Sequence, residues 1–313
     1  MRISTSSFYD QGTANISNIQ SKQMQLQNQI STGKRILNPS DDPIASAQLL
    51  ALKNAQNVNT EYTNTRATAE SNLTAADSIM GTIADRLTSI KSSITAANKS
   101  TLSSTDRKAI AVQLQNDLEN LVALGNSKDS NGDYMFAGQS VKTQPFSNAP
   151  ALTTPITAYT GAYAGDNNQR DVQVSTSRTM SLSEVGSNFF ATTAPNTSPD
   201  IFVTLSSVIG VLNDPTTPAA TISSTLANSG AVIDAATETV LTSRASVGAR
   251  LNELDGLDTA GSALDVQYQQ NISNLEDLDY SKALSEISKQ STILEAAQKA
   301  FTKTAGLSLF SMM

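Results

Sequence analysis

Ser31 and Lys34 form a Ser-x-x-Lys pattern, in which a lysine amine can act as the base for a serine nucleophile. The chain has no histidine, so the commonest general base and the commonest metal ligand are both missing. It has no cysteine either, which excludes disulfides and leaves the redox compartment undetermined. A chain of 313 residues this rich in serine contains such patterns by chance. We therefore predict that the protein is not an enzyme and has no catalytic residues.

The acidic stretch from Asp129 to Asp133 is the second candidate for chemistry, because its oxygen ligands suit calcium. Its glycine is misplaced for an EF-hand loop, and no bidentate glutamate follows at the required distance. Asn131-Gly132 is instead a typical turn sequence. Neither a Walker loop nor a dinucleotide-binding fingerprint occurs. The sequence thus predicts a turn here, with no metal site and no cofactor.

Composition narrows the class of protein further. There are 21 basic and 28 acidic residues, a formal charge of −7, which disfavours nucleic acid as a partner. Aromatic residues make up only 5% of the chain, which suits long helices with small-residue seams in about two or three domains. We expect no transmembrane helix and no secretory signal, since no sufficiently long apolar stretch is present. These features alone predict a soluble, cytoplasmic protein.

The run from Ser31 to Ala45 separates two helical patterns and is predicted to be a hinge. Gly33 weakens the first helix, and Asn38-Pro39 stops it because a residue before proline avoids the helical region. Asp41 and Asp42 can cap the next helix, whose first turn suits proline. The predicted hinge residues are Gly33, Asn38, Pro39, Asp41, Asp42 and Pro43.

The segment before the hinge carries an apolar seam with alternating steps of three and four, formed by Ile16, Ile19, Gln23, Leu26, Ile30, Gly33 and Leu37. A slightly basic helix of this kind can lie on a membrane surface. Its polar face is mostly uncharged, however, so we favour a seam for partner helices over membrane binding.

Helical spacing continues after the hinge, from about Pro43 to Ala97 and again from Ile110 to Leu124. Two helices with a short connection between them should fold back as an antiparallel hairpin, with Ser103 or Ser104 as the cap of the second. Helical spacing returns over 201–212 and 222–275. A last seam contains Tyr280, Leu284, Ile287, Leu294 and Phe301.

Glycine, proline and threonine are concentrated between residues 132 and 198, where alternating stretches at 171–175 and 179–182 predict strands. We therefore expect a mainly α-helical protein with a small β insert, in which the two arms form a long antiparallel bundle or coiled coil. The predicted domains are a terminal coiled coil (1–42 with 271–313), a helical core (43–131 with 199–270) and a β-rich insert (132–198).

Several blocks resemble those of a known family. The run from Ser31 to Ala45 resembles the hinge of the bacterial flagellin superfamily, and the block from Arg244 to Asn252 resembles one found across that superfamily. Within it, the insert blocks GDYMFAG (Gly132 to Gly138) and RDVQV (Arg170 to Val174) resemble the hook-associated protein 3 (FlgL) family, the hook–filament junction proteins. The two ends, 1–5 and 306–310, are similar to this family as well.

The resemblance implies a structural protein of the flagellum that joins the hook to the filament. It implies a ring of identical subunits, between the preceding hook-associated protein (FlgK) and flagellin, and an export chaperone before secretion. The protein is then cytoplasmic before export by the type III pathway and extracellular afterwards. Neither nucleic acid nor membrane is expected as a partner.

One N-terminal helix against one C-terminal helix buries little apolar surface for the entropy that ordering costs, so we predict that the ends fold on assembly. The predicted assembly interface consists of Ile16, Ile19, Leu26, Ile30, Leu284, Ile287, Leu294 and Phe301. Two alternatives remain open. A divergent flagellin would polymerise alone, and a helical secreted effector or adaptor would bind a partner outside the flagellum.

Overall fold

The computed structural model describes residues 5–146, 159, 163–190 and 200–310. Within them, the chain falls into two compact units: unit 1 (Met1–Thr60 and Ser262–Met313) and unit 2 (Glu61–Gly261). The elements in chain order are α1 (Thr5–Thr32), α2 (Pro43–Ala97), α3 (Ser104–Gly125), β1 (Asp171–Ser175), β2 (Arg178–Ser181), α4 (Gly186–Phe190), α5 (Ile201–Asn213), α6 (Ala219–Glu276) and α7 (Tyr280–Phe310). Two of the helices, α2 and α6, contribute residues to both units.

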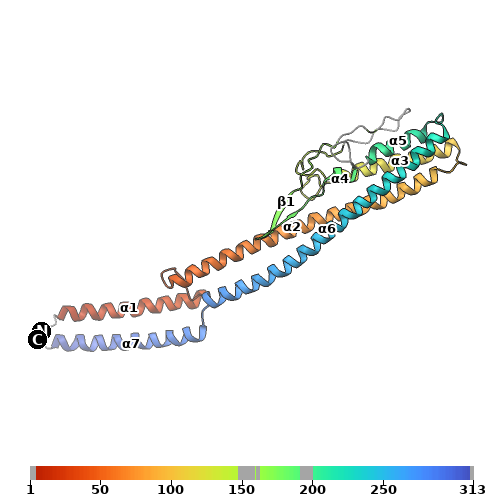
Figure 1. Cartoon of the computed structure of the whole chain (residues 1–313). Helices are drawn as coiled ribbons and strands as arrows, with labels where there is room; N and C mark the ends of the chain where they lie inside the picture. Colours follow the sequence, from red (N-terminus) through yellow and green to blue (C-terminus); the bar gives the residue numbers. More distant parts are fainter. Residues whose placement is uncertain (1–4, 147–158, 160–162, 191–199, 311–313) are drawn as a thin grey trace. The chain divides into compact units, whose positions relative to one another are not determined.

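Unit 1 contains α1 and α7 side by side as an antiparallel pair (Figure 1). Gln23 of α1 donates a hydrogen bond to Ser291 of α7 (Nε2–Oγ 3.1 Å). The unit also contains the first part of α2 and the last part of α6. Gln56 of α2 donates a hydrogen bond to Asp265 of α6 (Nε2–Oδ1 3.0 Å). Unit 1 is therefore formed by two segments that lie at opposite ends of the sequence and pair with each other.

Unit 2 is built on the second part of α2 and the first part of α6, with α3 and α5 packed together beside them (Figure 1). A capping box starts α3, because the Ser103 side chain accepts from the Asp106 N–H while Asp106 accepts from the Ser103 N–H. Fully buried leucines and isoleucines at helical spacing form one continuous core. Charged pairs such as Arg86–Asp117 and Arg244–Asp77 connect the helices.

A small antiparallel hairpin, β1 with β2, belongs to unit 2 and pairs Val172 with Met180. Arg66 of α2 anchors it. This side chain is only 4% exposed, and it donates to the carbonyl oxygen of Val174 (3.2 Å) and to Asp258 of α6 (3.2 Å). Buried aromatic rings pack the rest of the insert against α3 and α5, the rings being Phe136, Tyr159, Phe146, Phe189, Phe190 and Phe202.

The predicted fold class is confirmed: the protein is mainly α-helical with a small β insert. The helix over Pro43–Ala97 and the strand over 171–175 occur where the pattern placed them, and β2 (Arg178–Ser181) lies one residue before the predicted stretch 179–182. The prediction for the end of the first helix is wrong. Its seam was predicted to run to Leu37, but α1 ends at Thr32. Gly33 has a φ of +71°, a left-handed conformation that ends the helix before the proline can.

The predicted domains, with boundaries at 42/43 and 270/271 and the insert as a domain of its own, stay a prediction. The two compact units divide at 60/61 and 261/262, and the insert lies in unit 2. Within its described part, strands occupy only β1 and β2, because turns and α4 take up much of the remainder. Parts of the predicted insert (147–158, 160–162 and 191–198) and the family-like end residues 1–4 lie outside the described residues.

Candidate assembly surface and hinge

The predicted seam residues of α1 are all half-buried: Ile16, Ile19, Leu26 and Ile30. On α7 the half-buried counterparts are Ile287, Leu294 and Phe301. Leu284 is different, because it is 53% exposed while its neighbour Ala283 is buried. Partial burial means that a helix pair covers only one side of each seam, and the remainder is available to further helices.

Close packing near the termini of the pair depends on Gly12. A Cβ at this position would lie 2.7 Å from the ring of Phe301, so a larger residue would push the ring aside. The same ring makes an edge-to-face contact with Tyr9, with centroids 5.9 Å apart. A groove of about 380 Å³ opens here between α1 and α7, next to Ile16 and Ala297.

Exposed apolar side chains are concentrated in unit 1. Among the described residues, eight large hydrophobic side chains of this unit are exposed, against three in unit 2. The eight are Met24, Ile44, Leu50, Leu264, Val266, Tyr280, Leu284 and Ile293. Most of them were absent from the predicted interface, because they lie outside the heptad positions and only the folded structure shows their exposure.

The two units also differ in formal net charge. Unit 1 has nine Lys and Arg against nine Asp and Glu, so its formal charge is zero, whereas unit 2 has twelve against nineteen and carries the whole −7. Copies that meet through unit 1 therefore experience no net like-charge repulsion. Neutrality and exposed apolar surface both favour unit 1 as the surface for assembly.

In the predicted hinge, two carboxylates cap backbone N–H groups. Asp41 accepts hydrogen bonds from the N–H of Leu37 (3.1 Å) and of Asn38 (2.9 Å). Asp42 accepts from the N–H of Ala45 (3.0 Å), which caps α2 at its first turn. This backbone bond, together with Arg35, lowers the pKa of the Asp42 carboxyl from its usual value. Five of the six predicted hinge residues lie in the connection 33–42 between α1 and α2, and the sixth, Pro43, is the first residue of α2.

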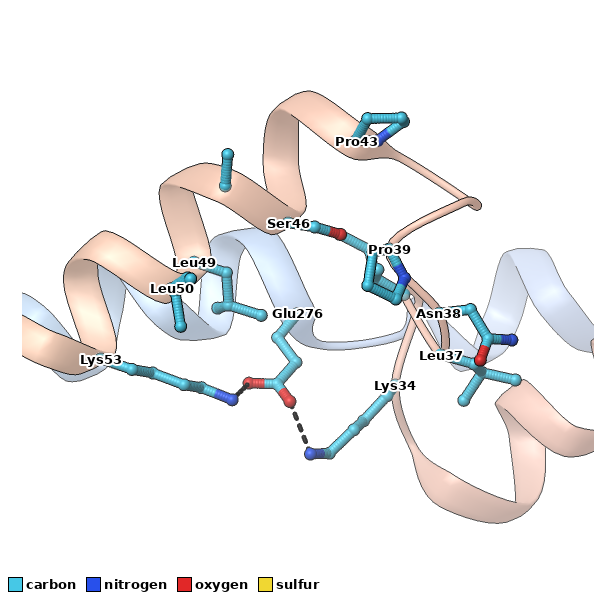
Figure 2. A pocket seen from close by; sticks show the side chains of 12 residues that line it. Lys34, Leu37, Asn38, Pro39, Pro43, Ser46, Leu49, Leu50, Lys53 and Glu276 are labelled. Carbon is cyan, nitrogen blue, oxygen red and sulfur yellow. Dashed lines mark ion pairs between the residues drawn. The ribbon is translucent and has the colours of Figure 1, made fainter.

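Glu276, at the end of α6, connects this turn to the C-terminal half of unit 1. Its carboxylate lies between the ammonium groups of Lys34 (2.5 Å) and Lys53 (2.7 Å), as Figure 2 shows. Hydrogen bonds from these two lysines lower the pKa of Glu276. Sequence analysis missed this contact, because nothing local indicates a pair separated by more than two hundred positions.

The three charges border a largely apolar groove of about 560 Å³ (Figure 2), lined by Ile36, Leu37, Asn38, Pro39, Pro43, Ser46, Ala47, Leu49 and Leu50.

Features of other functions are absent from the described part of the chain. No group of histidine, cysteine, aspartate or glutamate side chains is arranged to hold a metal ion there. The stretch from Asp129 to Asp133 is a turn, in which Asp129 accepts from the N–H groups of Asn131 and Asp133. None of the described helices is both long and apolar enough to cross a membrane.

Comparison with known proteins gives consistent results. Residues 3–141 match the bacterial flagellin N-terminal helical region. The flagellar hook-associated protein 3 of Escherichia coli (strain K12) is 34% identical over 325 aligned positions, covering 100% of this chain and 99% of that protein.

Solved structures share the fold at lower identity. The flagellar hook-associated protein 3 of Legionella pneumophila is 22% identical, with a TM-score of 0.61 over 72% of this chain and 98% of that chain. A structure of the flagellar junction protein FlgL from the same species covers 74% of this chain and all of its own, at 22% identity and a TM-score of 0.57.

Proposed function

Because the chain belongs to the flagellar hook-associated protein 3 family, we propose that it is a structural subunit of the bacterial flagellum that joins the hook to the filament. The observation that carries this proposal is the match to the Escherichia coli relative over the full length of both chains. The aligned region includes the N-terminal helices, the C-terminal helices and the insert. These are the parts that a junction needs for its different contacts. The protein is accordingly a structural component, with no catalytic role.

The proposed assembly is a ring of identical subunits in contact through unit 1. Half-buried seams, exposed apolar side chains and zero net charge in this unit support such self-association. The ring has two different axial faces, so its contacts to neighbouring layers are head-to-tail. We propose FlgK as the partner on the hook side and flagellin on the filament side, since a junction must match one lattice on each face.

The proposed route to this position is export. An export chaperone holds the chain in the cytoplasm, and the type III pathway then secretes it to the extracellular flagellum. Marginal packing of the α1–α7 pair supports an arm that stays unfolded until assembly. A divergent flagellin remains the second candidate, because residues 3–141 also match the flagellin N-terminal region.

A clean deletion strain tests the proposal. We expect hooks that still carry FlgK, no filaments, and flagellin monomer in the medium, because exported flagellin finds no matching surface. Immunoblots of hooks and supernatant, together with motility in soft agar, provide the readout, and complementation with the intact gene is the control. Normal filaments in the deletion strain would contradict a junction role. Filaments assembled from the purified protein alone would instead support the flagellin candidate.

A further inference from the structure

The break between α6 and α7 lacks the residues that usually end a helix. α6 ends at Glu276 and α7 begins at Tyr280, yet residues 277–279 contain neither glycine nor proline. The sequence has no glycine from 262 to 305 and no proline after Pro218. Sharp helix breaks usually carry one of these residues or an inserted group. The one local signal is Asp279, which caps α7 by accepting from the N–H of Ser281 and Lys282.

A continuous helix would satisfy the backbone groups that this break leaves free. The N–H groups of residues 278–280 would then donate to the carbonyl oxygens of residues 274–276. The structure supplies a substitute from the other end of the chain, because the N–H of Leu278 donates to the carbonyl oxygen of Gly33 (2.9 Å). Gly33 therefore takes the place of a helical acceptor.

Arg35 replaces the missing helical donors. Its backbone N–H donates to the carbonyl oxygen of Glu276 (2.7 Å), and its guanidinium donates to the carbonyl oxygen of Leu275 through Nη2 (2.9 Å) and Nε (3.2 Å). Both oxygens would accept helical bonds if α6 continued. Gly33 and Arg35 thus provide partners for three of these groups, the N–H of Leu278 and the carbonyl oxygens of Leu275 and Glu276.

Side chains hold the N-terminal hinge in this position. Lys34 and Lys53 both contact the Glu276 carboxylate (Figure 2), and Arg35 pairs with Asp42 at 3.1 Å. The Tyr280 hydroxyl oxygen lies 2.9 Å from the point where a Cβ on Gly33 would stand, so α7 starts directly against the backbone of this glycine.

We propose that docking of the hinge segment 33–35 imposes the break between α6 and α7, and that the two helices become one continuous helix when this segment is displaced. The C-terminal helix α7 then takes its direction only after the N-terminal segment has docked through residues 33–35. The N-terminal and C-terminal segments of the chain therefore fold together. This inference rests on contacts within unit 1 and is independent of the partners proposed above.

Distance measurement between two spin labels tests the proposal in the full chain. Ser262→Cys and Gln298→Cys introduce the only thiols, because the natural chain has no cysteine. In a straight helix these positions lie ten turns apart on one face, at about 54 Å, and a break makes the distance shorter.

Labelled chain is diluted with unlabelled chain and assembled on isolated hooks. The hinge variant is Lys34→Ala with Arg35→Ala, and Asp279→Ala is the matched control that removes the local cap.

We expect a short distance for the otherwise unchanged chain and for Asp279→Ala, and a new population near 54 Å for the hinge variant. A hinge variant with the unchanged short distance, or a long distance caused by Asp279→Ala alone, would overturn the proposal. If a variant is not incorporated into hooks, the labelled chain without further substitution is measured in trifluoroethanol, which favours helices and weakens tertiary contacts. A distance near 54 Å there supports the proposal, and a persistent short distance overturns it. Failure of every chain to bind hooks would count against the proposed function only.

Discussion

Units 1 and 2 use the same kind of long helix but bury it to very different extents. Most of the fully buried apolar side chains belong to unit 2, whereas in the described part of unit 1 only Ile36, Ala45 and Ala283 are buried apolar residues. Unit 2 therefore has a core that can support folding on its own. Unit 1 has seams that two helices half cover, and we propose that its stability depends on neighbouring subunits.

We infer from this difference that unit 2 folds within one chain, whereas unit 1 serves assembly. In unit 2 the insert adds buried aromatic rings and the Arg66 anchor, which join helices and hairpin into one core. In unit 1 exposed apolar side chains remain, and net charge is absent. Most large apolar side chains of unit 2 are buried within one chain, and we propose that assembly covers those that unit 1 leaves exposed.

The largest effects are expected when a buried or half-buried leucine of either unit is replaced by aspartate. The substitution in unit 2 should affect folding, and the substitution in unit 1 should affect assembly. Leu294→Asp puts an unpaired carboxylate in the half-buried seam, whereas Leu118→Asp puts one in the closed core of unit 2. An unpaired buried carboxylate costs several kcal/mol. We expect Leu118→Asp to prevent folding of unit 2, and Leu294→Asp to leave unit 2 folded while abolishing incorporation. Circular dichroism melting and immunoblots of isolated hooks measure both, and equal ring occupancy for Leu294→Asp and the unchanged chain would refute the seam.

A smaller effect should follow from added bulk in the closed core. A Cβ at Gly125 would lie 2.8 Å from the Phe146 ring and 3.2 Å from Phe190, so Gly125→Ala should destabilise unit 2 by about 2 kcal/mol. Gly230→Ala is the matched control, because nothing lies within 4 Å of its added Cβ, and in a helix it should stabilise by about 0.5–1 kcal/mol. Urea unfolding gives both values. Equal effects of the two substitutions would show that the aromatic cluster is not tightly packed.

The smallest predicted effect is a pH dependence from Asp200, the N-cap of α5. Burial raises the pKa of this carboxyl from 3.8 to about 6, and its Oδ2 has no hydrogen-bond partner among the described residues. The folded state therefore holds the proton more tightly than the unfolded state, so stability falls as pH rises from about 4 to 6 and then stays level.

Asp200→Asn keeps a good cap without the charge. Because the group is partly exposed, we expect this variant to be about 1 kcal/mol more stable at pH 7 and equal to the unchanged chain at pH 4. Urea unfolding at the two pH values checks this prediction. An equal difference at both values would mean that ionisation of Asp200 is not its cause.

Local signals explain why much of the fold could be predicted. Pro43 and the cap at Asp42 mark the start of α2, the capping box at Ser103 marks α3, and alternation marks β1 and β2. The α1 seam could also be placed, because heptad spacing depends on neighbours along the same helix.

Features that depend on distant contacts could not be predicted. Nothing near Glu276 in the sequence indicates its lysine partners, Lys34 and Lys53. On α7 the three–four pattern selected Leu284, but packing buries Ala283 instead, because spacing alone leaves the rotation of the helix undetermined. Whether Leu284 belongs to the interface between copies stays a prediction.

Hydrogen exchange with mass spectrometry tests most directly whether unit 1 depends on neighbours while unit 2 folds alone. The amides of α1 and α7 are compared with those of α3, in dilute free chain and in chain incorporated into hooks. We predict that α3 is protected in both samples, and that α1 and α7 exchange as unstructured chain when free and become protected when incorporated. Protection of α1 and α7 in the dilute free chain equal to that of α3 would contradict the account.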